Sequence, residues 1–254
     1  MQLIHVVEDW ILILAVYLMN HGCQAQFDWR DNNIEVFNMP FFGFVPSENL
    51  LKNIQTGIEK KNSNEPLYPL RDQTALLINE EIIDALLTEL VRRFPASDKR
   101  DTAEKLAGYV KSTVAVLLKQ LLSKADNDVV RQSIEFSERS LFKDPQGQFR
   151  VGTALNANLV TNLKSTFAEI QAGTDINRAG LSELYKQFAD ATIAHFMKDF
   201  NKTLDLGMIK RKASDIAAAA VGKAVHIAID KLIPNLTKDE LKAMAEYHDS
   251  LFFN

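Results

Sequence analysis

Apolar residues recur at intervals of three and four along most of this chain, which is the spacing that places them on one face of a helix. The periodicity predicts helices over the following segments: residues 10–18, 47–61, 73–94, 101–124, 126–142, 153–173, 181–207, 215–233 and 237–253. The connections are short, and short connections place neighbouring helices antiparallel. We therefore predict a predominantly all-α protein, a multi-helix bundle of about seven to nine helices.

Capping residues mark several of these helix ends. Ser47 and Asp72 are predicted N-caps, because their short polar side chains can accept a hydrogen bond from the first helical turn. Two pairs of residues have the spacing of a capping box: Asp101 with Glu104, and Thr237 with Glu240. Gly173 and Gly207 are predicted to end the helices that precede them.

One segment, residues 24–46, breaks the helical pattern and is rich in aromatic side chains. Its Asp-Asn-Asn turn and loosely alternating flanks predict a short hairpin or loop. Exposed aromatic and Met side chains are typical of interaction surfaces. We therefore select five residues as a candidate contact with a partner protein or an apolar ligand: Trp29, Met39, Phe41, Phe42 and Phe44. The alternative is that these rings close the open end of the bundle.

The segment DIAAAAVGKAVHIAID, residues 215–230, is almost free of polar side chains. Lys223, His226 and Asp230 fall on one stripe of a helix, and the rest of its circumference is apolar. This geometry predicts a core helix with one face that reaches solvent. Three cations stand just before it: Lys210, Arg211 and Lys212. Contact with a membrane surface is therefore the alternative.

The first apolar run extends from Trp10 to Leu18 and is shorter than the roughly 20 residues that a transmembrane helix needs. Glu8 and Asp9 precede it, whereas a signal peptide begins with positive charge. We predict a partly amphipathic, largely buried helix. Membrane anchoring and a cleaved or lipidated leader are the alternatives.

The length of 254 residues suits one helical domain. The most turn-like stretch in the middle of the chain is KDPQGQFRVG, so a sub-boundary near residues 144–152 would divide it into 1–145 and 152–254. Within that stretch, QFRVG fits either a strand or a loop. The single-domain prediction, 1–254, is preferred because the core could run across the boundary.

The charge balance and the cysteine content exclude several classes of function. The formal net charge is −4, which argues against a nucleic-acid binder, since those proteins usually carry a basic stripe. The single cysteine, Cys23, excludes an internal disulfide framework and a cysteine-rich zinc site. Freedom from disulfides fits a reducing compartment, so we expect a cytoplasmic protein, with a periplasmic or membrane-associated protein as the alternative. Phosphate-binding glycine loops and zinc-protease patterns are missing, and no cofactor is evident.

Three histidines are each followed by an aspartate four residues later: His5 and Asp9, His195 and Asp199, and His226 and Asp230. Residues at that spacing share a helix face, and a carboxylate can orient an imidazole toward a metal. The candidate metal or acid–base residues are therefore His195, Asp199, His226 and Asp230. The alternative is a set of partly buried structural pairs.

By elimination, we predict a non-catalytic, bacterial-type helical module that binds another protein, as adaptors, secretion accessories and toxin inhibitors do. Two alternatives remain. The first is a binder of a lipid or other apolar ligand between helices. The second is a metal- or haem-dependent helical enzyme that uses His195 or His226. The expected partner is a protein and not a nucleic acid, and the oligomeric state is left open.

Overall fold

The computed structural model describes residues 39–96 and 98–253, with the side chains of residues 98, 99, 102 and 106 left out. Several sequence predictions lie outside the described residues: the apolar run Trp10–Leu18, the His5 and Asp9 pair, Cys23, Trp29 and the first part of the aromatic segment. Residues Pro40–Asn254 form one compact unit.

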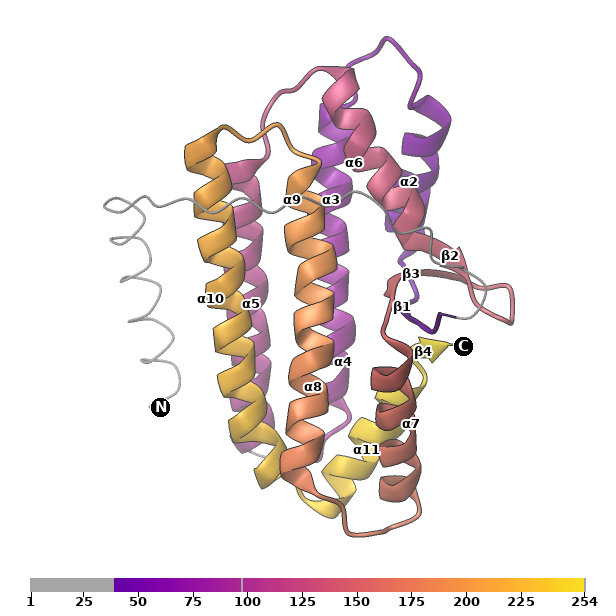
Figure 1. Ribbon diagram of the computed structural model, residues 1–254, viewed down its shortest axis with the longest axis vertical. Helices are drawn as coiled ribbons and strands as arrows, with labels where there is room; N and C mark the ends of the chain where they lie inside the picture. The colour runs from indigo at the N-terminus through magenta and orange to yellow at the C-terminus, as the bar shows by residue number, and fades with distance from the viewer. Residues whose placement is uncertain (1–38, 97, 254) are drawn as a thin grey trace. The chain divides into compact units, whose positions relative to one another are not determined.

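Helices dominate this unit (Figure 1), so the prediction of a predominantly all-α bundle is confirmed. The α-helices are α2 (Glu48–Lys60), α3 (Tyr68–Ile83), α4 (Glu89–Arg92), α5 (Asp98–Leu121), α6 (Asn127–Ser140), α7 (Ala157–Gln171), α8 (Arg178–Ile193), α9 (Phe200–Lys202), α10 (Met208–Leu232) and α11 (Lys238–Asp249). Three shorter turns continue or join them: the π-helices η2 (Asp84–Thr88) and η3 (Ala194–Asp199), and the 3₁₀ turn η4 (Ile233–Asn235).

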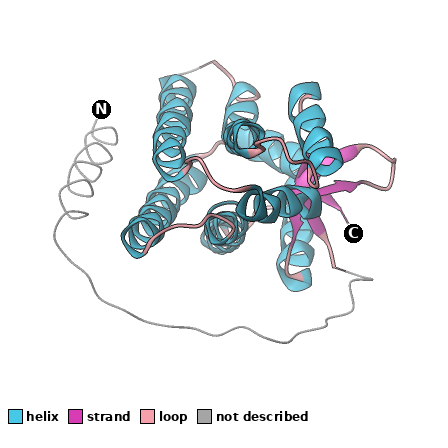
Figure 2. Cartoon of the chain, turned by 90° about the horizontal axis from the view of Figure 1, so that it is seen from above, coloured by secondary structure: helices cyan, strands magenta, loops and turns pink. Residues whose placement is uncertain are grey.

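A small antiparallel sheet lies at one side of the helices (Figure 2). Its strands are β1 (Phe41–Phe44), β2 (Leu141–Lys143), β3 (Phe149–Ala154) and β4 (Phe252–Phe253), in the spatial order β2-β3-β1-β4. The QFRVG stretch therefore contributes to a strand, and the residues near 144–152 belong to the β2–β3 hairpin. β1 pairs with β3 and β4, which are far away in the sequence, and not with a neighbouring strand of a local hairpin.

Some of the predicted helix ends are confirmed. The Ser47 hydroxyl accepts a hydrogen bond of 3.1 Å from the Leu50 N–H, and Thr237 and Glu240 form the complete capping box. Gly173 follows α7 with a φ of 79°, a left-handed conformation that glycine adopts without strain.

Other helix ends were predicted wrongly. α3 begins at Tyr68, before Asp72, because Pro69 fits the first turn of a helix. Asp101 lies inside α5, which begins at Asp98. Gly207 precedes α10 as its N-cap, and the helix before it already ends at Lys202.

The main core lies where the sheet packs on α7, α8 and α11. Phe42, Leu163 and Ala245 are fully buried there, and Phe167 and Met244 are almost fully buried. At the other side of the bundle, α5 and α10 lie side by side (Figure 1, Figure 2). Among the described residues, no helix has the length and apolar character needed to cross a membrane.

The helix predicted from residues 215–230 exists as part of α10, but it is less buried than a core helix. Only Ser214, Ala217 and Ala218 of α10 are buried, and its other apolar side chains are half-buried or exposed. The prediction of a core position was therefore too strong, because α10 packs on α8 along one side and lies at the edge of the bundle.

Candidate functional site

The aromatic segment supplies core residues and not an exposed patch. Phe42 and Phe44 point from β1 into the main core, and the Phe42 ring centroid lies 5.0 Å from that of Phe188. Met39 is 41% exposed and Phe41 is half-buried, while Trp29 lies outside the described residues. Phe42 and Phe44 are therefore buried core residues where the sheet packs on the helices.

The opposite face of the sheet carries a second aromatic group. Phe41 and Phe142 have ring centroids 4.9 Å apart, and the Arg150 guanidinium lies 4.8 Å from the Phe253 ring centroid. Arg150 also donates a 2.9 Å hydrogen bond to Asp144. Burial would raise the pKa of Asp144, but the hydrogen bonds from Arg150 and from backbone N–H groups lower it. This arrangement closes the β2–β3 turn and orders Arg150 over the sheet.

The four candidate metal residues do not form one cluster. His195 lies in η3 and its Nε2 is 2.9 Å from the Ser140 hydroxyl, which itself donates to the Phe136 carbonyl. The Ser140 oxygen therefore accepts a hydrogen bond from His195 Nε2–H. Asp199 pairs at 2.8 Å with Lys202 instead of with His195.

The second pair is divided between partners on α8. His226 Nε2 lies 2.8 Å from the Asp190 carboxylate. Asp230 forms an ion pair with Lys186, in which the ammonium nitrogen lies 2.7 Å from a carboxylate oxygen. Each of the four candidate residues therefore contacts a residue other than its predicted partner. For Asp199 that residue is Lys202, three positions along the same helical segment, and for the other three it lies on a different helix. Within the described residues, no group of three or more His, Cys, Asp or Glu side chains is placed to hold a metal ion.

Sequence reasoning missed a buried His–Tyr pair. The Tyr185 hydroxyl lies 2.6 Å from His248 Nδ1, and both residues are buried between α8 and α11. The Leu86 carbonyl also interacts with this imidazole, so we place the imidazole proton on Nε2 and assign the Tyr185 hydroxyl as the donor to Nδ1. Nε2 is buried. The adjacent Tyr247 donates at 2.6 Å to the carbonyl of Ala85 in the π-helix η2, so α11 is anchored to the α3–η2–α4 helix.

Acid is expected to weaken the fold through these histidines. Burial lowers the pKa of His195 and of His248 from the ordinary 6.5 to about 4. The unfolded chain then binds more protons below pH 6.5, so stability falls as the pH drops from 6.5 to about 4. At about pH 4.5, each histidine should cost about 2–3 kcal/mol.

Urea unfolding of the protein and of His195→Gln at neutral and acidic pH measures this effect. The variant should lose less stability between the two pH values by about 2–3 kcal/mol, whatever its stability at neutral pH. An identical loss in both proteins would show that His195 is not held neutral by the fold.

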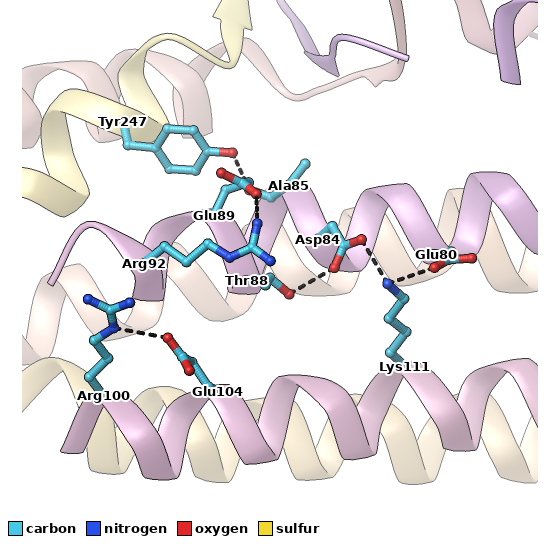
Figure 3. A network of polar contacts seen from close by, with 10 residues as sticks. All are labelled: Glu80, Asp84, Ala85, Thr88, Glu89, Arg92, Arg100, Glu104, Lys111 and Tyr247. Atoms are coloured by element: carbon cyan, nitrogen blue, oxygen red, sulfur yellow. Dashed lines mark hydrogen bonds and ion pairs between the residues drawn. The ribbon is translucent and has the colours of Figure 1, made fainter. Parts of the chain in front are cut away.

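A polar network attaches the inner side of α5 to α3 and η2 (Figure 3). The Lys111 ammonium lies 2.8 Å from both Glu80 and Asp84, and Asp84 also accepts a hydrogen bond of 2.9 Å from Thr88. Burial would lower the pKa of Lys111, but the hydrogen bonds that it donates to its two carboxylate partners raise it. This network fixes the orientation of α5 and leaves its other side turned away from α3.

Incompletely covered apolar side chains lie on that other side of α5 and on α10, two helices that contact each other. On α10, Ile209, Ile216, Ala220 and Ile227 are separated by seven, four and seven residues, so they share a stripe opposite the buried Ala218. On α5, Val116 is 54% exposed, and at the start of α10 Met208 and Ile209 are 69% and 84% exposed. We call these residues, Val116, Met208, Ile209, Ile216, Ala220 and Ile227, the α5–α10 face.

A cleft of about 670 Å³ opens at one end of the bundle, between the loops around residues 63–68, 121–127 and 204–206. Arg71 is almost fully buried in its wall and donates to the Ser123 carbonyl, while Lys124 and Asp205 line its rim. Polar and apolar side chains are mixed around it. A pocket for a lipid is lined mainly by apolar side chains, so this cleft does not resemble one.

Comparisons with protein-family models, with curated proteins and with solved structures found no match to this chain.

Proposed function

We propose that this chain is a non-catalytic interaction module that binds another protein through the α5–α10 face. The observation that carries the proposal is the incomplete burial of a nearly continuous apolar stripe on α10, together with the exposed Val116 on α5. Contiguous exposed apolar surface is typical of protein–protein interaction sites. The Lys111 ion pairs hold the opposite side of α5 against α3 and η2, so Val116 is turned away from those helices.

The three histidines in the described part of the chain support this proposal over the enzyme alternative. His195 and His248 are held neutral by burial, and each has a hydrogen bond to a buried hydroxyl. His226 is engaged by Asp190 on the adjacent helix. In the described part of the chain, these side chains stabilise the packing of α6, α8, α10 and α11.

The test compares two exposed valines that differ only in their location. Val116 is 54% exposed on the α5–α10 face, and Val45 is 49% exposed between β1 and α2. A partner is first identified by native mass spectrometry of the full chain purified gently from its source, and is then purified for titration. We expect Val116→Glu to weaken its binding by at least roughly tenfold, because a charge would be buried in an apolar contact.

Val45→Glu should leave the affinity for the same purified partner unchanged. Both variants should unfold at the urea concentration of the unsubstituted protein, since neither side chain is buried. Equal affinity of all three proteins would contradict the proposal, as would a partner whose binding is weakened only by Val45→Glu.

A further inference from the structure

The two helices that carry the α5–α10 face differ in charge from the rest of the chain. α5 and α10 together contain 10 Lys and Arg and 5 Asp and Glu, although the whole chain has more acidic than basic residues. Lys105, Lys119 and Lys210 are exposed there and make no ion pair within the described residues. The exposed carboxylates on the same two helices are Asp101, Asp215 and Asp230, and Asp126 and Asp205 are exposed in the adjoining loops. The exposed side chains of α5 and α10 are therefore basic on balance.

The shape of the α10 stripe favours a helix as its occupant. Between Ile216 and Ile227, Ala219, Ala220 and Ala224 are small and at least partly exposed, and Lys223 is the long exposed side chain among them. Small side chains allow the backbone of a second helix to approach closely. From Ile209 to Ile227 the stripe is about 27 Å long, which matches about five turns of a partner helix.

We infer that the α5–α10 face binds an acidic amphipathic helix of a partner protein, with its apolar side on the α10 stripe and its carboxylates beside the lysines of α5 and α10. This inference rests on the proposed function and adds the chemistry of the partner. An anionic membrane would also match the charge. The outward stripe of α10, however, lacks the Trp, Phe and Leu side chains with which amphipathic helices enter a bilayer.

Three fluorescent peptides of about five turns test the inference against the full chain by anisotropy. The first has Leu and Ala on one face and Glu on the flanks, the second has Lys in place of Glu, and the third is a scramble of the first. We expect the acidic peptide to bind more than roughly tenfold tighter than either of the others. Its affinity should fall between about 50 mM and 500 mM salt, because exposed ion pairs are screened.

Val116→Glu should weaken binding of the acidic peptide by at least roughly tenfold, and Val45→Glu should not. Equal binding of the acidic and lysine peptides, or of the acidic peptide and its scramble, would overturn the inference. Binding to phosphatidylserine vesicles that is lost in Val116→Glu, without binding of the acidic peptide, would assign the face to a membrane instead. Self-association of the full chain that is lost in Val116→Glu would assign it to a second copy.

The outcome separates this inference from the proposed function. If the purified partner depends on Val116 but the acidic peptide does not bind, the α5–α10 face remains the binding surface and the chemistry inferred for its partner is wrong. If neither depends on Val116, both the proposed function and the inference fail.

Discussion

Phe42→Ala is expected to lower the free energy of unfolding by about 3–5 kcal/mol, the usual cost of removing a buried aromatic ring from a core. Phe42 is fully buried in the central part of the sheet, and its ring packs on Phe188 of α8 and Phe252 of β4. The alanine would leave a cavity where the sheet packs on α8. Urea denaturation followed by circular dichroism measures the change.

Phe41→Ala is the matched control, because the neighbouring Phe41 lies on the other face of β1 and is only half-buried. It should cost less than about 2 kcal/mol, since part of its surface is already in contact with water. Similar losses in the two variants would contradict the assignment of Phe42 to the core. A Phe42→Ala variant of unchanged stability with weakened partner binding would restore the sequence prediction that this ring contacts a partner.

Gly152→Ala is expected to cost on the order of 3 kcal/mol or to prevent folding, because the added methyl group has no space. A Cβ at this position would lie 1.8 Å from the Phe42 carbonyl oxygen and 2.6 Å from the Gly43 Cα. Both of these atoms belong to the backbone of the adjacent strand, so no side-chain rotation can relieve the clash. Expression of the folded protein and its urea midpoint measure the loss.

Gly108→Ala is the control for a glycine without a steric role. Gly108 is exposed within α5, and a Cβ there would meet nothing within 4 Å. Alanine favours a helix over glycine, so this variant should be more stable by about 0.5–1 kcal/mol. If Gly152→Ala is tolerated as well as Gly108→Ala, β1 and β3 do not pair in the register of the structure.

Hydrophobic periodicity was sufficient to predict most of the helices, because each depends on residues close together in the sequence. Ser47 and the Thr237–Glu240 capping box were predictable for the same reason. The predicted starts of two helices, α3 and α5, were wrong. Pro69 starts α3 ahead of Asp72, and α5 extends past its expected cap at Asp101.

The sheet could not be predicted, because its pairs join distant segments. Phe41 pairs with Ala154 and with Phe253, and no local pattern identifies either partner. The aromatic side chains of the segment were correctly noted as unusual. Their burial depends on strands that come from the middle and the end of the chain, so Phe42 and Phe44 appeared as candidates for an exposed contact.

The candidate site depends on the position of α10, which composition does not determine. An Ala-rich helix with few polar residues fits the centre of a bundle or its edge equally well. Packing of α10 on α8 through the contacts of His226 and Asp230 leaves the stripe of Ile216 and Ile227 partly uncovered. The His226–Asp230 pair that the spacing predicted does not form, because the partners of both residues lie on α8.

The α5–α10 face is tested most directly by hydroxyl-radical footprinting of the full chain with and without its purified partner. Two exposed methionines report on different surfaces, since Met208 belongs to the face and Met39 precedes β1. We predict that the partner slows oxidation of Met208 and leaves that of Met39 unchanged. Protection of Met39 with unchanged oxidation of Met208 would contradict the account and would place the binding surface at the start of the sheet.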